Sequence, residues 1–165
     1  METRQILSDF DHPSIVDKAN ELTGSTKSTE QKIEAIFQFV RDDIKFGFPP
    51  KWDIVKASEV LDYGLGYCNP KATLFLALLR ATDISARIHC GLIDIQIMKG
   101  IFPSRLFSSM PSAGPHSWIE IEIDGTWMSI DSYINDERFY VHALELLQES
   151  GRDSGRSRVS CSFLP

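Results

Sequence analysis

The stretch from Gly64 to Arg80 constrains the fold of this chain more than any other part of its sequence. It reads Gly-Leu-Gly-Tyr-Cys-Asn-Pro and continues without a break into Lys-Ala-Thr-Leu-Phe-Leu-Ala-Leu-Leu-Arg. Proline is favoured at the first helical position, because the N–H that it lacks would have no partner there. The residues after Pro70 are apolar on nearly every side, which is typical of a buried helix. The sequence therefore predicts a buried central helix over about residues 69–81, with Cys68 at or just before its N-terminus.

A cysteine at the start of a helix is a candidate nucleophile. The helix macrodipole and the free backbone N–H groups stabilise negative charge there, so the position favours a thiolate over a thiol. A cysteine considered alone is more often a small buried hydrophobe. The case for Cys68 therefore depends on whether the chain also supplies a base and a group that orients the base.

The other segments predict a mixture of helices and antiparallel strands, which is an α+β fold. Apolar residues at helical spacing predict helices over about residues 29–41, 56–61 and 141–148. Alternating or extended patterns predict strands over about 44–48, 85–93, 116–123 and 126–131. Residues 94–115 are rich in proline, glycine and serine, and a loop of that length is either a substrate-binding lid or a simple insertion.

Length and composition place limits on the class of protein. A chain of 165 residues fits one domain, expected over 1–150, with 151–165 as a polar and disordered tail. The net charge of −6 argues against nucleic acid or an anionic membrane as a partner. No apolar run approaches the ~20 residues that span a bilayer, and the polar N-terminus is unlike a signal peptide. Three widely spaced cysteines form neither a disulfide framework nor a metal knuckle, so we expect a reduced, cytoplasmic protein without cofactor.

The segment 116–123 alternates strictly, and the Asp-Gly pair at 124–125 is a strong hairpin signal. A two-residue turn pairs residue 123 with 126 and so sets Trp118 opposite Asp131. Because side chains two apart share a face, His116 becomes the diagonal neighbour of Asp131. The same register buries the isoleucines on the other face. A carboxylate beside a histidine fixes its tautomer and stabilises the imidazolium, so this pair is a candidate base and orienting group.

Other residues offer weaker alternatives. His89 lies on a predicted strand soon after the central helix and is the competing base, whereas His12 and His142 have no partners in the sequence pattern. Cys90 is expected in the core. A zinc site made of the candidate cysteine, histidine and aspartate is possible by ligand type, but no second ligand pair at metal spacing supports it, so no metal is predicted.

Four motifs in order resemble the transglutaminase-like superfamily over about residues 30–135. They are Gly-Leu-Gly-Tyr-Cys68, the segment from Ala77-Leu-Leu-Arg80 to Ala86-Arg87, His116-Ser-Trp118, and Trp127-Met-Ser-Ile-Asp131. The resemblance implies a papain-like fold, in which the buried helix that carries the cysteine packs on an antiparallel sheet. It also implies a catalytic triad, carried here onto Cys68, His116 and Asp131.

Two departures from the family pattern affect turn residues. Asp83 and Ser85 stand where the pattern has Gly and Pro, and Ser132-Tyr133 replaces Pro-Thr after the aspartate. Neither departure touches the three triad positions.

The resemblance implies acyl transfer through a thioester, most simply the hydrolysis of an amide or peptide bond in a peptide, a protein or a small amide. Amine transfer to protein glutamine is the alternative within the same chemistry, and a non-catalytic domain that binds a peptide or protein is the alternative outside it. The Cys68 N–H is an expected oxyanion donor. The Trp52 indole is a candidate second donor, although a core aromatic is the favoured interpretation of this residue, and Tyr67 is expected to line the cleft.

Overall fold

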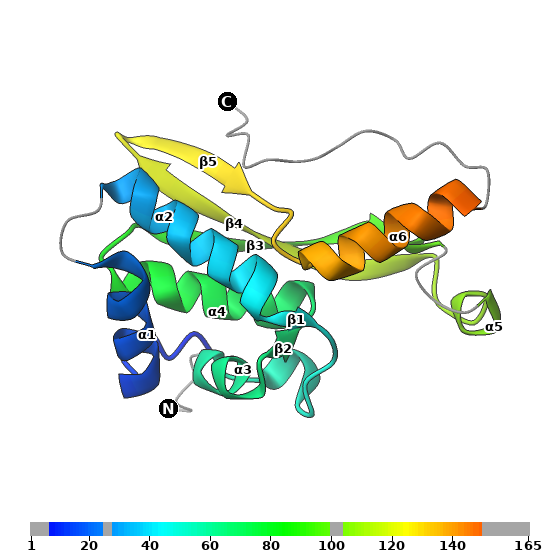
Figure 1. Ribbon diagram of the computed structural model, residues 1–165, viewed down its shortest axis with the longest axis horizontal. Helices are drawn as coiled ribbons and strands as arrows, with labels where there is room; N and C mark the ends of the chain where they lie inside the picture. Colours follow the sequence, from blue (N-terminus) through cyan, green and yellow to red (C-terminus); the bar gives the residue numbers. More distant parts are fainter. Residues whose placement is uncertain (1–6, 25–27, 100–103, 150–165) are drawn as a thin grey trace.

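Helices pack on one face of a three-stranded antiparallel sheet (Figure 1). The computed structural model describes residues 7–24, 28–99 and 104–149, so the tail expected over 151–165 lies outside the described residues. The helices are α1 (Pro13–Thr23), α2 (Thr29–Gln38), α3 (Ala57–Tyr63), α4 (Cys68–Ala81), α5 (Ser104–Phe107) and α6 (Glu137–Glu149). The strands are β1 (Lys45–Phe46), β2 (Leu65–Gly66), β3 (Ala86–Asp94), β4 (Ala113–Ile123) and β5 (Thr126–Ile130). The predicted α+β class is confirmed.

The predicted central helix is α4. It begins at Cys68, with Pro70 in its first turn, and contacts α1, α2 and α3 on one side and the sheet on the other. The apolar side chains of α4 are buried along most of its length: Ala72, Leu74, Phe75, Leu76, Ala77, Leu78 and Leu79. Burial of so many apolar groups, at about 25 cal/mol per Å², makes α4 the main contributor to the core.

The hairpin forms in the predicted register. Ile119 pairs with Ile130, residue 121 with 128, and residue 123 with 126. The turn residues Asp124 and Gly125 have φ of 50° and 76°, which is the left-handed geometry that a tight two-residue hairpin needs. Ile119 and Ile121 are buried, as the register predicted, so the even-numbered residues of β4 face away from α4.

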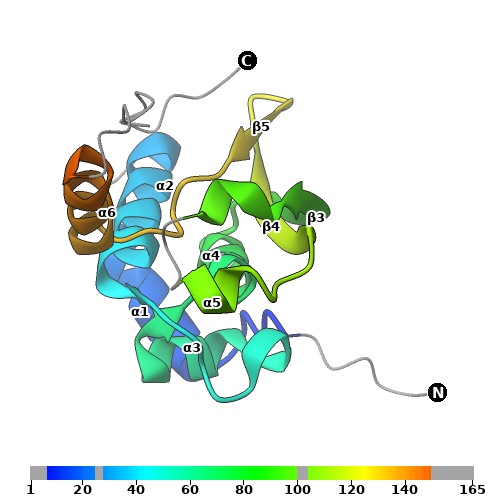
Figure 2. The same cartoon turned by 90° about the vertical axis from the view of Figure 1, so that its right-hand side faces the viewer.

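Strand β4 is longer than its partner β5, and this difference creates a free edge. β4 pairs with β3 from residue 121 down to 113, but its pairing with β5 stops at Ile119. Backbone groups of odd-numbered residues in β4 point toward β5, so those of Pro115 and Ser117 have no strand beside them. The extended part of β3 and β4 runs beyond the layer formed by α1, α2, α3 and α4 in Figure 1, and Figure 2 shows α5 at its near end.

The segment predicted as loop-rich, 94–115, also contains short regular elements. They are a 3₁₀ turn at Ile95–Met98, the short helix α5, and the first residues of β4. Proline and glycine in this stretch separate these short elements and do not prevent them.

A short parallel pair joins two segments that flank the helix start. Lys45 pairs with Leu65 and Phe46 with Gly66, so the chain before the 3₁₀ turn at Trp52–Ile54 lies beside the glycine motif. The position of Gly66 is tight, since a Cβ there would meet the Pro70 Cβ at 3.2 Å.

Cys90 is exposed on β3 and does not lie in the core as expected. β3 is an edge strand, and Ile88 and Leu92 on the same face are exposed as well, because the described helices cover this face only near Ala86.

None of the helices in the described ranges has the length and apolar character that a bilayer crossing requires.

Candidate active site

The free edge of β4 receives the side chain of Cys68. Its Sγ lies 3.8 Å from the carbonyl oxygen of Pro115, within reach of a weak S–H donor. The backbone N–H groups of Asn69 and Ser117 also face the sulfur. The start of α4 thus takes the place that β5 would occupy if it continued, directly beside the segment that carries His116.

His116 and Asp131 meet on the face of the hairpin that points away from the core. His116 Nε2 lies 2.9 Å from Asp131 Oδ2, so the diagonal contact predicted from the register is confirmed. Asp131 Oδ1 accepts a hydrogen bond of 2.8 Å from the backbone N–H of Ser132. The imidazole is 12% exposed and packs at 6.3 Å against the ring of Trp118. With Nε2 held by the carboxylate, Nδ1 is the nitrogen left to exchange a proton.

Two polar residues that the sequence did not single out tie the helix start to its neighbours. The Ser117 hydroxyl donates to Asn69 Oδ1 at 2.7 Å, and Asn69 Nδ2 donates to Asp53 Oδ1 at 2.8 Å. Asn69 therefore links β4, α4 and the 3₁₀ turn across the residue next to Cys68. The alternation of β4 does place Ser117 on the face toward α4, but no sequence pattern identifies its partner.

A buried lysine holds the segment that follows β5. Lys71 is fully buried one turn after Cys68, and its Nζ donates to the carbonyl oxygens of Arg41 at 3.0 Å and Tyr133 at 3.2 Å. Tyr133 is also fully buried, and its hydroxyl donates to the Ser117 carbonyl at 3.3 Å. Asp131 is two residues before Tyr133, so α4 holds both the cysteine and the backbone next to the aspartate.

Burial raises the pKa of the Cys68 thiol above its ordinary value, and the nearby carboxylates of Asp53 and Asp131 raise it further. The N–H groups of Asn69 and Ser117 lower the same pKa, since they stabilise a thiolate. The expectation that the helix start alone favours a thiolate is therefore wrong. Burial outweighs the free N–H groups, so the net effect of the surroundings is to raise the pKa of Cys68.

Four aromatic side chains from the segments that precede Cys68 form a cluster. They are Phe46, Phe48, Trp52 and Tyr67, which we call the aromatic cluster. The Tyr67 hydroxyl donates to Asp53, and burial together with this carboxylate raises the pKa of the Tyr67 phenol well above its usual range. Trp52 is 59% exposed, so it is not a core aromatic. Its proposed role as an oxyanion donor stays a prediction.

The competing histidines make other contacts. His89 packs against Trp118 at 5.4 Å between ring centres, and its Nε2 is 2.8 Å from Glu120 Oε2. The angles at this contact do not fit a hydrogen bond, so the interaction between the His89 ring and the Glu120 carboxylate is an electrostatic one. The His12 ring is hydrogen-bonded to the Ser14 hydroxyl, and His142 Nδ1 lies 3.7 Å from Glu145 Oε2 at the surface. Across the described ranges, no three His, Cys, Asp or Glu side chains are grouped so that they could hold a metal ion.

The chain belongs to the transglutaminase-like superfamily, whose family model matches residues 16–132. This match covers most of the helical layer, the hairpin and the three predicted site residues. Among curated proteins, none matches the chain.

Three solved structures share the fold. A candidate cysteine protease from Cytophaga hutchinsonii has a TM-score of 0.60 and 19% identity, covering 78% of this chain and 39% of its own. A candidate protease from Parabacteroides distasonis has a TM-score of 0.51 and 13% identity, covering 77% and 26%. The periplasmic domain of TgpA from Pseudomonas aeruginosa has a TM-score of 0.54 and 21% identity, covering 77% and 46%. The chain therefore spans less than half the length of the structures it resembles.

Proposed function

We propose that this chain is a cysteine-dependent acyl-transfer enzyme that hydrolyses an amide or peptide bond through a thioester. The observation that supports it is that Cys68 lies against the Pro115 carbonyl at the free edge of β4, one residue before His116, which is hydrogen-bonded to Asp131. The names of two structural relatives as candidate proteases agree with this proposal. In it Cys68 is the nucleophile, His116 the base and acid, and Asp131 the residue that orients the imidazole.

In the first half of the reaction, the thiol of Cys68 gives its proton to Nδ1 of His116 while the sulfur attacks the carbonyl carbon. The S–C bond forms, and the π electron pair of the carbonyl moves onto its oxygen. When this pair returns, the C–N bond breaks and the nitrogen takes the proton from His116. The leaving group departs as a neutral amine, and the acyl group remains on Cys68 as a thioester.

Water completes the cycle. It gives a proton to Nδ1 of His116 as its oxygen attacks the thioester carbonyl, and the S–C bond then breaks. The sulfur takes the proton from His116, which restores the thiol, and a carboxylic acid is released. Asp131 stabilises the imidazolium in both halves, and this stabilisation matters more where the resting thiol has a raised pKa.

The oxyanion formed in each half needs hydrogen-bond donors. Cys68 is the first residue of α4, so its backbone N–H is free of the helix and is one donor. The Trp52 indole N–H is the proposed second donor. Its backbone φ of 50° is rare for a bulky residue, and such strain concentrates at functional sites.

The transfer of the acyl group to an amine is the alternative within this mechanism, since a primary amine and water compete for the same thioester. A non-catalytic binding domain is the alternative outside it. The expected cytoplasmic setting also stays a prediction, because one structural relative is a periplasmic domain.

Acylation by p-nitrophenyl acetate tests the proposal. The wild-type protein should release p-nitrophenolate in a burst, with the acetyl group found on Cys68 by peptide mass spectrometry. His116→Ala should slow the burst on the order of 100-fold or more, and Cys68→Ala should abolish it. Cys90→Ser is the control for the other described thiol, which is exposed on β3 opposite Ser117 and should not carry the acetyl group. Equal acylation of Cys68 and Cys90, with no effect of His116→Ala, would refute the proposal. Added primary amine then separates transfer from hydrolysis by the products released.

A further inference from the structure

We propose that the aromatic cluster beside Cys68 is a substrate-binding subsite that takes an uncharged, apolar side chain, preferably an aromatic one, from the acyl part of the substrate. This inference rests on the proposed function and gives it a substrate class.

The rings of the cluster contact one another and remain open to solvent. Phe48 is central, with its ring centre 5.3 Å from that of Trp52 and 5.2 Å from that of Tyr67. Phe48 is 47% exposed, and Ile54 beside Trp52 is 72% exposed. Contiguous exposed apolar groups of this kind mark binding surfaces, whereas single exposed apolar residues do not.

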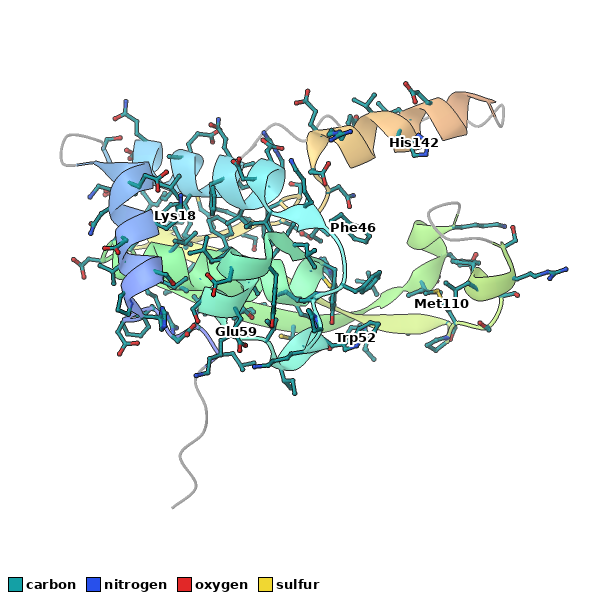
Figure 3. The ribbon with its side chains drawn as sticks, turned by 60° about the horizontal axis from the view of Figure 1, so that its bottom comes forward. Lys18, Phe46, Trp52, Glu59, Met110 and His142 are labelled. Atoms are coloured by element: carbon teal, nitrogen blue, oxygen red, sulfur yellow. The ribbon has the colours of Figure 1, made fainter. Side chains whose placement is uncertain are left out.

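The cluster has a fixed position relative to the nucleophile. Tyr67 immediately precedes Cys68, and the Tyr67 hydroxyl and Asn69 Nδ2 both donate to Oδ1 of Asp53. The carboxylate thus ties the 3₁₀ turn that carries Trp52 to the residues on each side of Cys68. Figure 3 shows Phe46 and Trp52 near the place where β3 and β4 leave the helical layer. A rigid wall of rings next to the reacting sulfur can orient a substrate at low entropic cost.

The direction of the substrate follows from the position of the acid. His116 lies on β4 and protonates the leaving amine, so the leaving group must extend toward β4. The aromatic cluster reaches Cys68 from the chain that precedes α4, through Tyr67, and not from β4, so we assign it to the acyl part. An apolar side chain there would stack on the rings of Phe48 and Trp52, and offset or edge-to-face contacts favour an aromatic one.

The charges around the site disfavour an anionic substrate. Asp53 and Asp131 both act electrostatically on the Cys68 sulfur. Lys51, which precedes Trp52, is held in an ion pair with Glu59. The subsite therefore has carboxylates close to the reacting atom, and Lys51 at the start of its 3₁₀ turn is already paired with Glu59.

Alkylation of Cys68 by three reagents tests the subsite without a known substrate. The reagents are iodoacetamide, N-benzyl iodoacetamide and iodoacetate, used on the protein with Cys90→Ser and Cys161→Ser so that Cys68 is its single thiol. In each case the sulfur displaces iodide and no oxyanion forms, so an oxyanion role of Trp52 does not enter the rates. Each rate is divided by that of free cysteine with the same reagent.

After this normalisation, we expect N-benzyl iodoacetamide to react at Cys68 on the order of tenfold faster than iodoacetamide. We call this ratio of normalised rates the benzyl preference. Iodoacetate should react more slowly than iodoacetamide. Trp52→Ala and Phe48→Ala should each bring the benzyl preference down toward one. Trp127→Ala is the matched control, since Trp127 is an exposed tryptophan near the hairpin turn, and it should keep the preference. Circular dichroism and thermal melting verify that each variant is folded.

A wild-type benzyl preference equal to that of free cysteine would overturn the inference, as would a preference that Trp52→Ala and Trp127→Ala reduce equally. The outcome is separate from that of the proposed function. Acylation independent of His116 together with a benzyl preference that needs Trp52 would refute the catalytic proposal and leave the aromatic cluster as an apolar binding site.

Discussion

Lys71 gives the stability of this protein a pH dependence that one substitution can isolate. Burial lowers the pKa of the Lys71 amine from 10.5 to about 7, and Lys45 and Arg41 act in the same direction. The carboxylates of Asp136 and Asp42 oppose the shift without cancelling it. A neutral amine has two N–H groups, and the structure provides two acceptors for them in the carbonyls of Arg41 and Tyr133.

The size of this pH effect follows from the difference between the pKa of Lys71 in the folded protein and its pKa in the unfolded protein. Between pH 7 and 10.5 the unfolded chain holds a proton on Lys71 that the folded chain has released, so stability rises with pH across this window. The full shift corresponds to roughly 5 kcal/mol, at about 1.4 kcal/mol per pKa unit. Between pH 6 and pH 9 the expected gain is roughly 2–3 kcal/mol.

Urea unfolding of the wild-type protein and of Lys71→Met, measured from pH 6 to pH 9, tests this prediction. Methionine keeps an unbranched chain of similar length and removes the titrating amine. We expect the wild-type protein to gain roughly 2–3 kcal/mol relative to Lys71→Met over this range. Lys99→Met, which changes an exposed lysine, should run parallel to wild type. A free-energy difference between wild type and Lys71→Met that stays constant over the whole pH range would refute the reasoning.

Three further predictions concern the surroundings of Cys68. Ser117→Ala removes the 2.7 Å hydrogen bond to Asn69 and should slow acylation of Cys68 by roughly tenfold, as about 1.4 kcal/mol of positioning is lost; an unchanged burst would contradict it. Asp53→Asn removes a charge that raises the pKa of Cys68, so the pH profile of iodoacetamide alkylation should shift to lower pH, and a shift to higher pH would argue against it. Gly66→Ala places a Cβ 3.2 Å from that of Pro70 and should cost roughly 1–3 kcal/mol in urea unfolding, where no loss would show that the helix start can move.

The parts of the fold that the sequence predicted are those encoded by local periodicity. The apolar run after Pro70 defines a buried helix wherever it packs. The Asp-Gly turn fixes the hairpin register by itself, and through it the contact between His116 and Asp131. Each of these features is determined by residues that are close along the chain or that face each other across a single turn.

The features that could not be predicted depend on contacts between distant segments. The approach of Cys68 to β4 spans 47 residues and exists because β5 ends before β4 does. The length of β5 is a tertiary outcome that alternation does not reveal. Lys71 stands in an apolar run, where periodicity cannot tell a lysine that reaches solvent from one that is buried on backbone carbonyls.

The error about the thiolate has the same physical origin. A helix start lowers the pKa of a cysteine through a few N–H groups, and these can be read from a sequence. Burial and the carboxylates of Asp53 and Asp131 come from the packing of three other segments around Cys68, and together they outweigh the N–H groups. Cys68 stays a candidate nucleophile, but the pKa of its thiol is not a local property of the sequence.

The raised pKa of Cys68 also decides how the proposed chemistry must be organised. A thiol that is not ionised at rest reacts only when a base takes its proton, so reactivity depends on the geometry of His116 more than on the field of the helix. That geometry depends in turn on Asp131, which lies two residues before Tyr133. Lys71, on the helix that carries the cysteine, donates to the Tyr133 carbonyl, and the Tyr133 hydroxyl donates to the Ser117 carbonyl on β4. The two halves of the proposed site, the helix start and the end of the hairpin, are therefore joined through a buried amine and a buried phenol.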